Sequence, residues 1–159
     1  MNYWLFKSEP TSYSIDNLKR DKKTAWDGVR NYQARNFMRD DMQIGDIGLF
    51  YHSNTKPIGI VGVVKICSKP YPDPTAFDKK DDHYDPQSKK ENPTWYLVDV
   101  CFVEKFNKII TLDQLKFDDS FSDMLVTQKG QRLSVQPVSK KHVVKILKMA
   151  DAKSKKYPL

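Results

Sequence analysis

Residues that commonly carry catalysis or metal binding are scarce in this chain of 159 residues. It holds two cysteines, three histidines and six glycines. Cysteines and histidines without close spacing do not form a zinc-binding pattern, and scattered glycines do not form a phosphate-binding loop. We therefore expect neither a bound metal nor a cofactor.

Long apolar runs are also missing. No run approaches the roughly 18 apolar residues of a membrane span, and the first residues do not resemble a secretory signal. Cys67 and Cys101 lie inside short apolar runs, which favours buried free thiols in a reducing compartment. We accordingly expect a cytoplasmic protein without a membrane partner.

Positive charge is concentrated near the C-terminus. The net charge is +7, and residues 139–159 contain seven lysines and a single aspartate. The rest of the chain is therefore nearly neutral. Two interpretations stay open, namely a basic terminal helix that touches phosphates and a solvated helix face with a lysine tail.

The pattern of apolar residues predicts more strands than helices. Strands are expected at 3–7, 24–26, 47–51, 58–67, 95–106 and 133–138. Helices are expected after Ser14, across 31–42 and after Ser139, with short helical or turn segments at 111–115 and 120–125. Because strands and helices do not alternate regularly, we predict an α+β fold with a mixed, barrel-like sheet.

A long polar loop interrupts this pattern at residues 69–94. It contains five of the nine prolines and has no apolar period. Loops of this length inside a domain are usually functional or mobile. Its aromatic residues are Tyr71, Phe77 and Tyr84.

The sequence contains no convincing catalytic arrangement. His52, His83 and His142 could each act as a general base, but none lies in a nucleophile elbow or a metal-binding pattern. Ser53 follows His52 directly, so on a strand the two side chains would point to opposite faces. We predict that the chain is not an enzyme, and keep a hydrolase or nuclease using His52 as the least favoured alternative.

Residues 26–36 favour a recognition site instead. Arg30 and Arg35 can bind phosphate in bidentate fashion, and a helix N-terminus favours the same anion. An aromatic side chain at the turn could stack on an unpaired base. The carboxylate of Asp27 or Glu9 could accept a hydrogen bond from an exocyclic amine such as cytosine N4. The alternative is that the aromatics are core residues and the arginines are solvated.

Four segments resemble the signature blocks of the EVE domain family. They are YWLFKSEP at residues 3–10, WDGVRNYQARNF at 26–37, GD followed by FYHSN at 45–54, and RLSVQPV at 132–138. The similarity runs from residue 3 to about residue 150. It implies one EVE domain over residues 1–150, with 151–159 as a basic C-terminal tail.

The resemblance also implies a fold and a function. EVE domains are PUA-like pseudo-barrels with short flanking helices, related to the YTH domains that read methylated adenine in RNA. They are thought to capture a modified base, above all modified cytosine in DNA, in a partly aromatic pocket, and they are not known as catalysts. We therefore expect a nucleic-acid-binding reader of the bacterial, stand-alone type, monomeric, with an RNA-binding PUA-like module as the alternative.

Site residues follow from the residues and from the resemblance together. The expected base pocket comprises Lys7, Ser8, Glu9, Trp26 and Asp27, with Tyr71 and Tyr84 as candidates for a second aromatic wall. Contacts to the nucleic-acid backbone are expected from Arg30, Asn31, Arg35, Tyr51, His52, Ser53, Asn54, Lys140 and Lys141. Ser134, Gln136 and Pro137 could line the same cleft or simply close the barrel.

Overall fold

The computed structural model describes residues 1–153 and Tyr157. Its strands are β1 (Tyr3–Ser8), β2 (Lys23–Ala25), β3 (Ile47–His52), β4 (Gly59–Ile66), β5 (Tyr71–Pro72), β6 (Tyr96–Leu97), β7 (Asp99–Thr111) and β8 (Val135–Pro137). Its α-helices are α1 (Ile15–Asp21), α2 (Tyr32–Asn36), α3 (Leu112–Phe117) and α4 (Lys140–Met149). Short 3₁₀ turns lie at Pro74–Phe77, Asp119–Phe121 and Leu125–Thr127.

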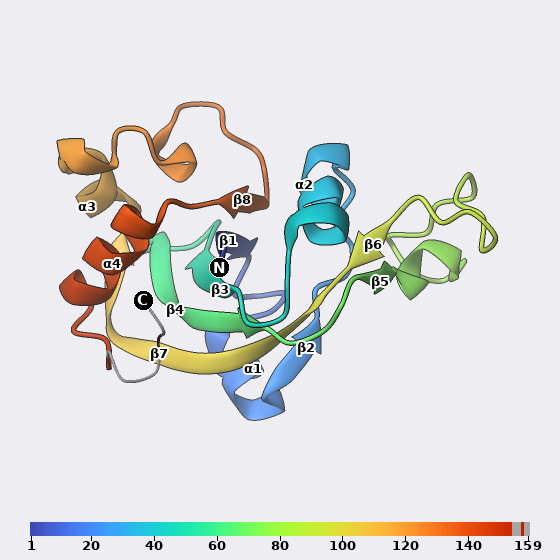
Figure 1. The fold of residues 1–159 in the computed structure, drawn as a ribbon, viewed down its shortest axis with the longest axis horizontal. Helices are drawn as coiled ribbons and strands as arrows, with labels where there is room; N and C mark the ends of the chain where they lie inside the picture. The colour runs from blue at the N-terminus through green and yellow to red at the C-terminus, as the bar shows by residue number, and fades with distance from the viewer. Residues whose placement is uncertain (154–156, 158–159) are drawn as a thin grey trace.

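Six strands form one curled, half-barrel sheet in the order β2-β7-β4-β3-β1-β8 (Figure 1). β1 and β3 run parallel, whereas the other neighbouring strands are antiparallel. β5 and β6 form a separate two-stranded ribbon. The predicted α+β class with a mixed, barrel-like sheet is therefore confirmed.

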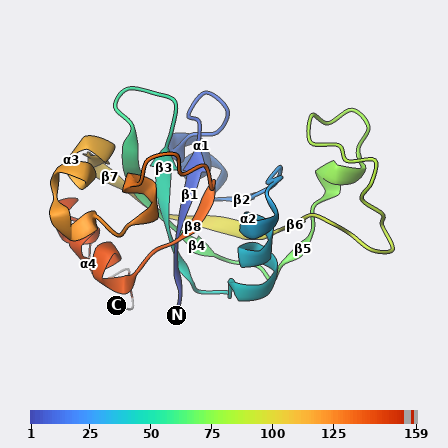
Figure 2. The ribbon, with the colours of Figure 1, turned by 90° about the horizontal axis from the view of Figure 1, so that it is seen from above.

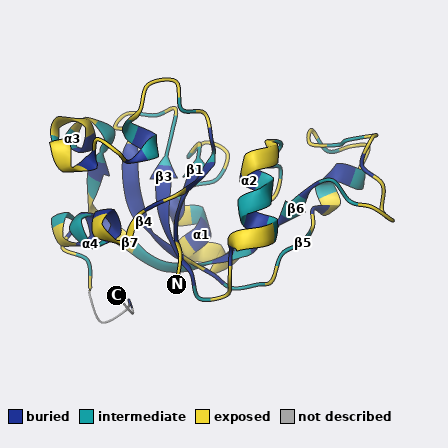
Figure 3. Cartoon of the chain, turned by 45° about the horizontal axis from the view of Figure 1, so that its top comes forward, coloured by how far each residue is buried: buried dark blue, intermediate teal, exposed yellow. Residues whose placement is uncertain are grey.

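β1 lies inside the sheet and is buried on both faces. Side chains on a strand alternate between faces, so Tyr3 and Leu5 enter one apolar core with α3 and α4. Trp4 and Phe6 enter a second core with α1 and α2. Figure 3 shows the strands as the buried centre of the molecule. This strand therefore connects both cores and carries its C-terminal end, Lys7 and Ser8, to the surface.

The helices begin at the predicted caps. The side chains of Ser14, Asn31 and Ser139 each accept a backbone N–H three residues further on, which satisfies a donor that the helix leaves free. The predicted helix at 31–42 is α2 continued by a π-helical turn at Phe37–Asp41.

The strand predicted at 95–106 is instead divided. β6 pairs with β5, and β7 joins the main sheet and continues to Thr111. The break falls at Val98, whose carbonyl accepts the N–H of Trp26. The apolar run alone does not show where the chain changes its partner strand. As a result, the segment at 73–95 lies at one end of the molecule, opposite α3 and α4 (Figure 2).

The prediction of buried free thiols is wrong. Cys67 and Cys101 form a disulfide, with Cα atoms 6.0 Å apart, and both residues are half-buried. Cys67 directly follows β4, and Cys101 lies on the neighbouring β7 opposite Lys65. Apolar neighbours along a strand do not bury every residue between them, because successive side chains point to opposite faces. This disulfide removes the argument for a reducing compartment that rested on free thiols.

Two described residues that follow α4 contact the sheet. The backbone N–H of Lys153 and the hydroxyl of Tyr157 both bond to the Glu104 carboxylate on β7. Tyr157 is buried, and burial raises the pKa of its hydroxyl. Lys155 and Lys156, part of the expected basic tail, lie outside the described residues. Among the described residues, no helix is long and apolar enough to cross a membrane.

Candidate functional site

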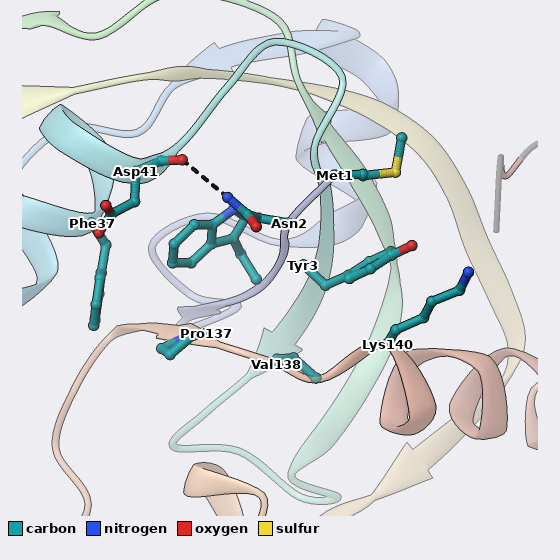
Figure 4. A pocket seen from close by; sticks show the side chains of 9 residues that line it. Met1, Asn2, Tyr3, Phe37, Asp41, Pro137, Val138 and Lys140 are labelled. Carbon is teal, nitrogen blue, oxygen red and sulfur yellow. Dashed lines mark hydrogen bonds between the residues drawn. The ribbon is translucent and has the colours of Figure 1, made fainter.

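Two hollows lie at opposite ends of β1. The one at its N-terminal end has a volume of about 730 Å³ and is lined by Met1, Asn2, Tyr3, Trp4, Phe37, Asp41, Pro137, Val138 and Lys140 (Figure 4). The one at its C-terminal end, which we call the cleft, has about 530 Å³. The cleft is lined by Lys7, Ser8, Glu9, Ser12, Tyr13, Thr24, Ala25, Trp26, Asp27, Gly28, Val29, Arg30, His83 and Ser134.

The cleft brings together most of the residues predicted for a base pocket. Lys7, Ser8 and Glu9 come from the end of β1, whereas Trp26 and Asp27 follow β2. Ser134, predicted as a lining residue, also borders it. The N-terminal hollow includes Pro137 and Lys140, so the structure separates these two from the cleft.

Trp26 is both a core residue and part of the cleft wall. Only 8% of its surface is exposed. Its ring lies 5.1 Å from Phe6 and 5.6 Å from Phe50, edge-to-face in both cases. Such packing fixes the orientation of the indole, so the part that faces the cleft is a rigid apolar surface.

The polar end of the cleft is crowded with carboxylates. Asp27 is exposed, but partial desolvation and the nearby charge of Asp73 raise the pKa of its carboxyl. Asp73 is fully buried, and it accepts hydrogen bonds from the Gly28 N–H (2.8 Å) and from Arg30 Nη1 (3.0 Å). Burial alone would raise the pKa of Asp73, but bonds from Thr75, Gly28 and Arg30 hold it below its ordinary value.

Arg30 clamps the long loop to the cleft. Its Nε and Nη2 donate to the His83 carbonyl at 3.0 and 2.7 Å. Its remaining N–H groups reach the Val29 carbonyl, Asp73 and Thr75 Oγ1. A guanidinium carries five N–H donors, so in this structure none is left over. Arg30 is therefore a loop clamp here, and not the free phosphate ligand that the sequence suggested.

His83 covers the backbone of Gly28. A Cβ atom placed on Gly28 would lie 2.7 Å from His83 Nε2, so only glycine admits the ring at this distance. Gly28 also has a φ of +76°, a conformation that glycine adopts without steric cost. His83 Nδ1 lies 2.9 Å from Asp81 Oδ1, which orients the ring. The loop therefore supplies an imidazole to the cleft.

The β1 end of the cleft supplies a partly buried cation. Burial lowers the pKa of Lys7. Its Nζ lies 3.4 Å from the Gln131 carbonyl and 5.9 Å from the centre of the Tyr51 ring. The Ser8 hydroxyl donates to the Tyr13 carbonyl at 2.6 Å. Lys7 thus lines the cleft while its ammonium group contacts Gln131 and Tyr51, and the Ser8 proton is already engaged.

The two tyrosines expected from the loop do not line the cleft. The Tyr71 hydroxyl donates to Asp99 Oδ1 at 2.6 Å, and burial together with this bond raises the pKa of Tyr71 to about 12. Tyr84 is half-buried in a turn that begins at Asp81. The wall expected from these tyrosines is occupied by His83 instead.

The residues expected to hold the nucleic-acid backbone have mainly internal contacts. Asn31 caps α2, and Arg35 Nη1 donates to the Thr94 carbonyl at 2.8 Å. His52 Nε2 accepts the Ile15 N–H at 3.1 Å, and burial lowers the pKa of His52. The Ser53 N–H donates to the Ser8 carbonyl.

The other residues of this group are spread over the surface and the core. Tyr51 is buried, and Asn54 occupies a turn with a φ of +50°. Lys141 pairs with Asp123 at 3.1 Å on the face of α4. Gln136, expected as a possible cleft residue, is buried and donates to the Leu133 carbonyl. Gln136 and Pro137 were expected either to line the cleft or to close the barrel. Their positions fit the second alternative.

Several cleft residues were not predicted for the site. Gly28 carried a turn signal in the Asp-Gly dipeptide, but nothing in the sequence showed that a loop residue would cover it. His83 was considered only as a general base. Asp73, buried and central to the clamp, lies in the proline-rich loop without any distinguishing pattern. Ser12, Tyr13, Thr24, Ala25 and Val29 complete the unpredicted lining.

Comparison with known proteins identifies the family. The family model described as the EVE domain matches residues 2–149. Thymocyte nuclear protein 1 from Rattus norvegicus is 45% identical over 170 residues, covering 95% of this chain and 74% of that protein. The crystal structure of the human THYN1 protein in complex with DNA containing 5-methylcytosine is similar at a TM-score of 0.88. It is 41% identical and covers 96% of this chain and 99% of that chain.

A bacterial structure is equally similar. The crystal structure of a protein from Pseudomonas syringae has a TM-score of 0.89 and 44% sequence identity, covering 93% of this chain and 99% of that chain. The family match and these relatives extend over nearly all of the sequence, as the four signature blocks predicted. The chain belongs to the EVE domain family.

Proposed function

We propose that this chain is a reader that captures a modified cytosine base of DNA in the cleft. The observation that carries the proposal is the cleft itself, in a fold that matches the human THYN1 protein bound to 5-methylcytosine DNA. Its volume of about 530 Å³ lies within the usual range of small-ligand pockets. We take residues 1–150 as one domain and 151–159 as a basic tail.

The lining supplies complementary chemistry for cytosine. The base presents an exocyclic N4 amine as donor, and the Asp27 carboxylate is an exposed acceptor at the cleft. Lys7 supplies donors for the ring and carbonyl acceptors of the base. Trp26 and Val29 offer apolar surface for the ring and for a substituent at C5. Ser134 borders the same space.

Energetics set the size of the expected discrimination. Extruding a base from a duplex costs a few kcal/mol, and stacking on an aromatic surface returns about 1–3 kcal/mol. One additional methyl group in an apolar pocket contributes roughly 1–3 kcal/mol. We therefore expect a preference for 5-methylcytosine over cytosine of roughly 5- to 100-fold.

A binding role also agrees with how the candidate catalytic groups are used. His52 accepts a backbone N–H, and His142 is buried against the Ser120 carbonyl and Asp123. The Ser8 proton is bound to a carbonyl. We therefore propose a reader without catalysis of its own, acting as a monomer where DNA is held, which in a bacterial cell is the cytoplasm.

Fluorescence-polarisation binding to matched duplexes tests the proposal. The duplexes contain cytosine, 5-methylcytosine or 5-hydroxymethylcytosine, with an RNA stem-loop as a further ligand, at two salt concentrations. A preference for a modified cytosine that persists at the higher salt supports the proposal. Equal binding that disappears with salt contradicts it, because phosphate attraction alone is salt-sensitive. Tighter binding to the RNA stem-loop would favour an RNA-binding module instead.

Asp27 is the residue to change, because Trp26 belongs to the core. Asp27→Ala removes an acceptor from an exposed side chain, so the fold is retained, and we expect affinity for modified DNA to fall roughly 10- to 100-fold. Asp82→Ala, an exposed carboxylate that does not line the cleft, is the matched control. Unchanged binding by Asp27→Ala would exclude the N4 contact.

The same contact predicts a pH dependence. The raised pKa of Asp27 means that its carboxylate is lost at a higher pH than an ordinary aspartate. Affinity should therefore weaken on acidification earlier than for a normal carboxyl contact. Asp27→Ala should remove this part of the pH dependence. Any pH dependence that comes from titration of the DNA should remain in the variant.

A further inference from the structure

Tyr32 is an exposed aromatic ring two residues along the chain from Arg30, which lines the cleft. It is the first residue of α2, and 62% of its surface is exposed. Its ring is stacked on Trp95, with centroids 5.1 Å apart and planes inclined by 25°. Trp95 itself is buried, with 6% exposed. Tyr32 therefore forms an aromatic ledge on a buried aromatic base, on a helix that Figure 3 shows with both exposed and half-buried residues.

The ledge is held in place from several sides. Trp95 Nε1 donates to Asp85 Oδ2 at 2.7 Å, which fixes the lower ring. The Arg35 guanidinium carbon lies 5.0 Å from the Tyr32 ring centre, and Arg35 is itself anchored to the Thr94 carbonyl. Because the ring is already ordered, little conformational entropy is lost when a ligand stacks on it.

Two guanidinium groups lie against the lower ring. The Arg30 guanidinium carbon lies 5.2 Å from the Trp95 ring centre, and that of Arg35 lies 6.0 Å from it. An aromatic surface with arginines beside it is typical of proteins that bind single-stranded nucleic acid through base stacking.

Arg30 connects the ledge to the cleft. It packs on Trp95 and also lines the cleft, so the ring stack and the cleft share one side chain. We infer that a strand whose modified base occupies the cleft runs past this side chain. Extrusion of that base disrupts the stacking of its neighbours in the duplex. A neighbouring base can then stack on a protein side chain instead.

We propose that Tyr32 is a second stacking site, which takes an unpaired nucleobase of the nucleic acid bound at the cleft. The proposal rests on the proposed function for the class of ligand, and adds a site that does not depend on base modification. Tyr32 acts on the affinity for any unpaired base, whereas the cleft selects the modified one.

Tyr32→Ala and Tyr32→Phe test this site together with a remote control. Phe117 on α3 is 92% exposed and does not line the cleft, so Phe117→Ala removes an exposed ring elsewhere, from a helix that Figure 1 shows apart from α2. The probes are an unmodified single-stranded DNA oligonucleotide and an abasic oligonucleotide of the same length. Circular dichroism and thermal unfolding confirm that each variant retains its fold.

Stacking predicts a base-dependent loss. Tyr32→Ala should weaken binding of the single-stranded oligonucleotide roughly 5- to 100-fold, with little change for the abasic oligonucleotide. Tyr32→Phe and Phe117→Ala should bind like the unmodified protein. Equal binding by Tyr32→Ala, or an equal loss on the abasic oligonucleotide, would overturn the proposal.

A duplex series separates this site from the cleft. Each duplex contains 5-methylcytosine and one 2-aminopurine. The 2-aminopurine replaces in turn each base next to the 5-methylcytosine and the base opposite it. We expect one position whose fluorescence changes between the unmodified protein and Tyr32→Ala, while the ratio of affinities for methylated and unmethylated DNA stays the same. If that ratio is one in both proteins but the single-strand result holds, the proposed function fails and the stacking site stands.

Discussion

The imidazole of His83 lies directly against the backbone of Gly28, 55 residues earlier in the chain. This contact joins the long loop to the turn that follows β2 and closes one side of the cleft. It is possible because Gly28 has no side chain and because Arg30 donates two hydrogen bonds to the His83 carbonyl. The glycine and the arginine therefore set the shape of the cleft together.

Replacing Gly28 should displace His83. Gly28→Ala places a methyl group 2.7 Å from the ring, so the ring has to move. We expect affinity for modified DNA to fall about tenfold, which corresponds to the loss of one hydrogen bond. Gly130→Ala is the matched control, because Gly130 also has a φ of +76° but has nothing within 4 Å. Both variants carry the cost of alanine at positive φ, about 1–2 kcal/mol.

Two readouts separate the effects. Thermal unfolding should report a similar loss for both variants from backbone strain, with an additional loss for Gly28→Ala. The chemical shifts of the His83 ring should change only in Gly28→Ala. If the two glycine variants bind modified DNA equally well, the position of His83 does not shape the cleft.

Removing Asp73 should release the loop. Asp73→Ala leaves Arg30 and the Gly28 N–H without their shared acceptor. Breaking a buried ion pair on one side costs about 3 kcal/mol or more. We expect faster amide hydrogen exchange across residues 69–94, with the sheet unaffected. Asp82→Ala, which changes an exposed carboxylate of the same loop, should exchange like the unmodified protein.

The same aspartate predicts an acid-induced opening. A carboxyl whose pKa is lowered in the folded state stabilises the fold above its unfolded pKa of about 3.9. This stabilisation is lost as the pH falls through the still lower folded pKa. Loop protection should therefore decrease below about pH 4, and Asp73→Ala should not show this decrease. A protection profile that is independent of pH in the unmodified protein would contradict the role of Asp73.

The disulfide should contribute measurably to stability. Cys67 and Cys101 are 34 residues apart, and the chain-entropy model assigns about 3–4 kcal/mol to closing a loop of that length. We expect the double variant Cys67→Ser with Cys101→Ser to unfold at lower urea concentration. A reducing agent should shift the unmodified protein by a similar amount and leave the double variant unchanged. Alkylation of both thiols in the untreated native protein would show that the disulfide is not formed.

Much of the fold was predictable because its determinants are local. Short apolar runs marked β1, β3 and β4, and Ser14, Asn31 and Ser139 were identified as helix caps. The division of the segment at 95–106 was not, since β6 and β7 differ in partner strand and not in composition. Trp26 illustrates the limit for the site, because its sequence neighbours could not show that one ring serves core and cleft together.

What the sequence by itself determined is most of the main-sheet strands and helices, the family, and the cleft residues adjacent along the chain, Lys7 to Glu9 and Trp26 to Asp27. Periodicity, caps and turn dipeptides act over a few residues, so they can be read from the chain. Only the tertiary structure decided that Arg30 clamps the loop, that His83 covers Gly28 and that Tyr32 stacks on Trp95. These contacts join residues 43 to 63 positions apart, and they follow from how the loop packs on the sheet, for which no local pattern exists.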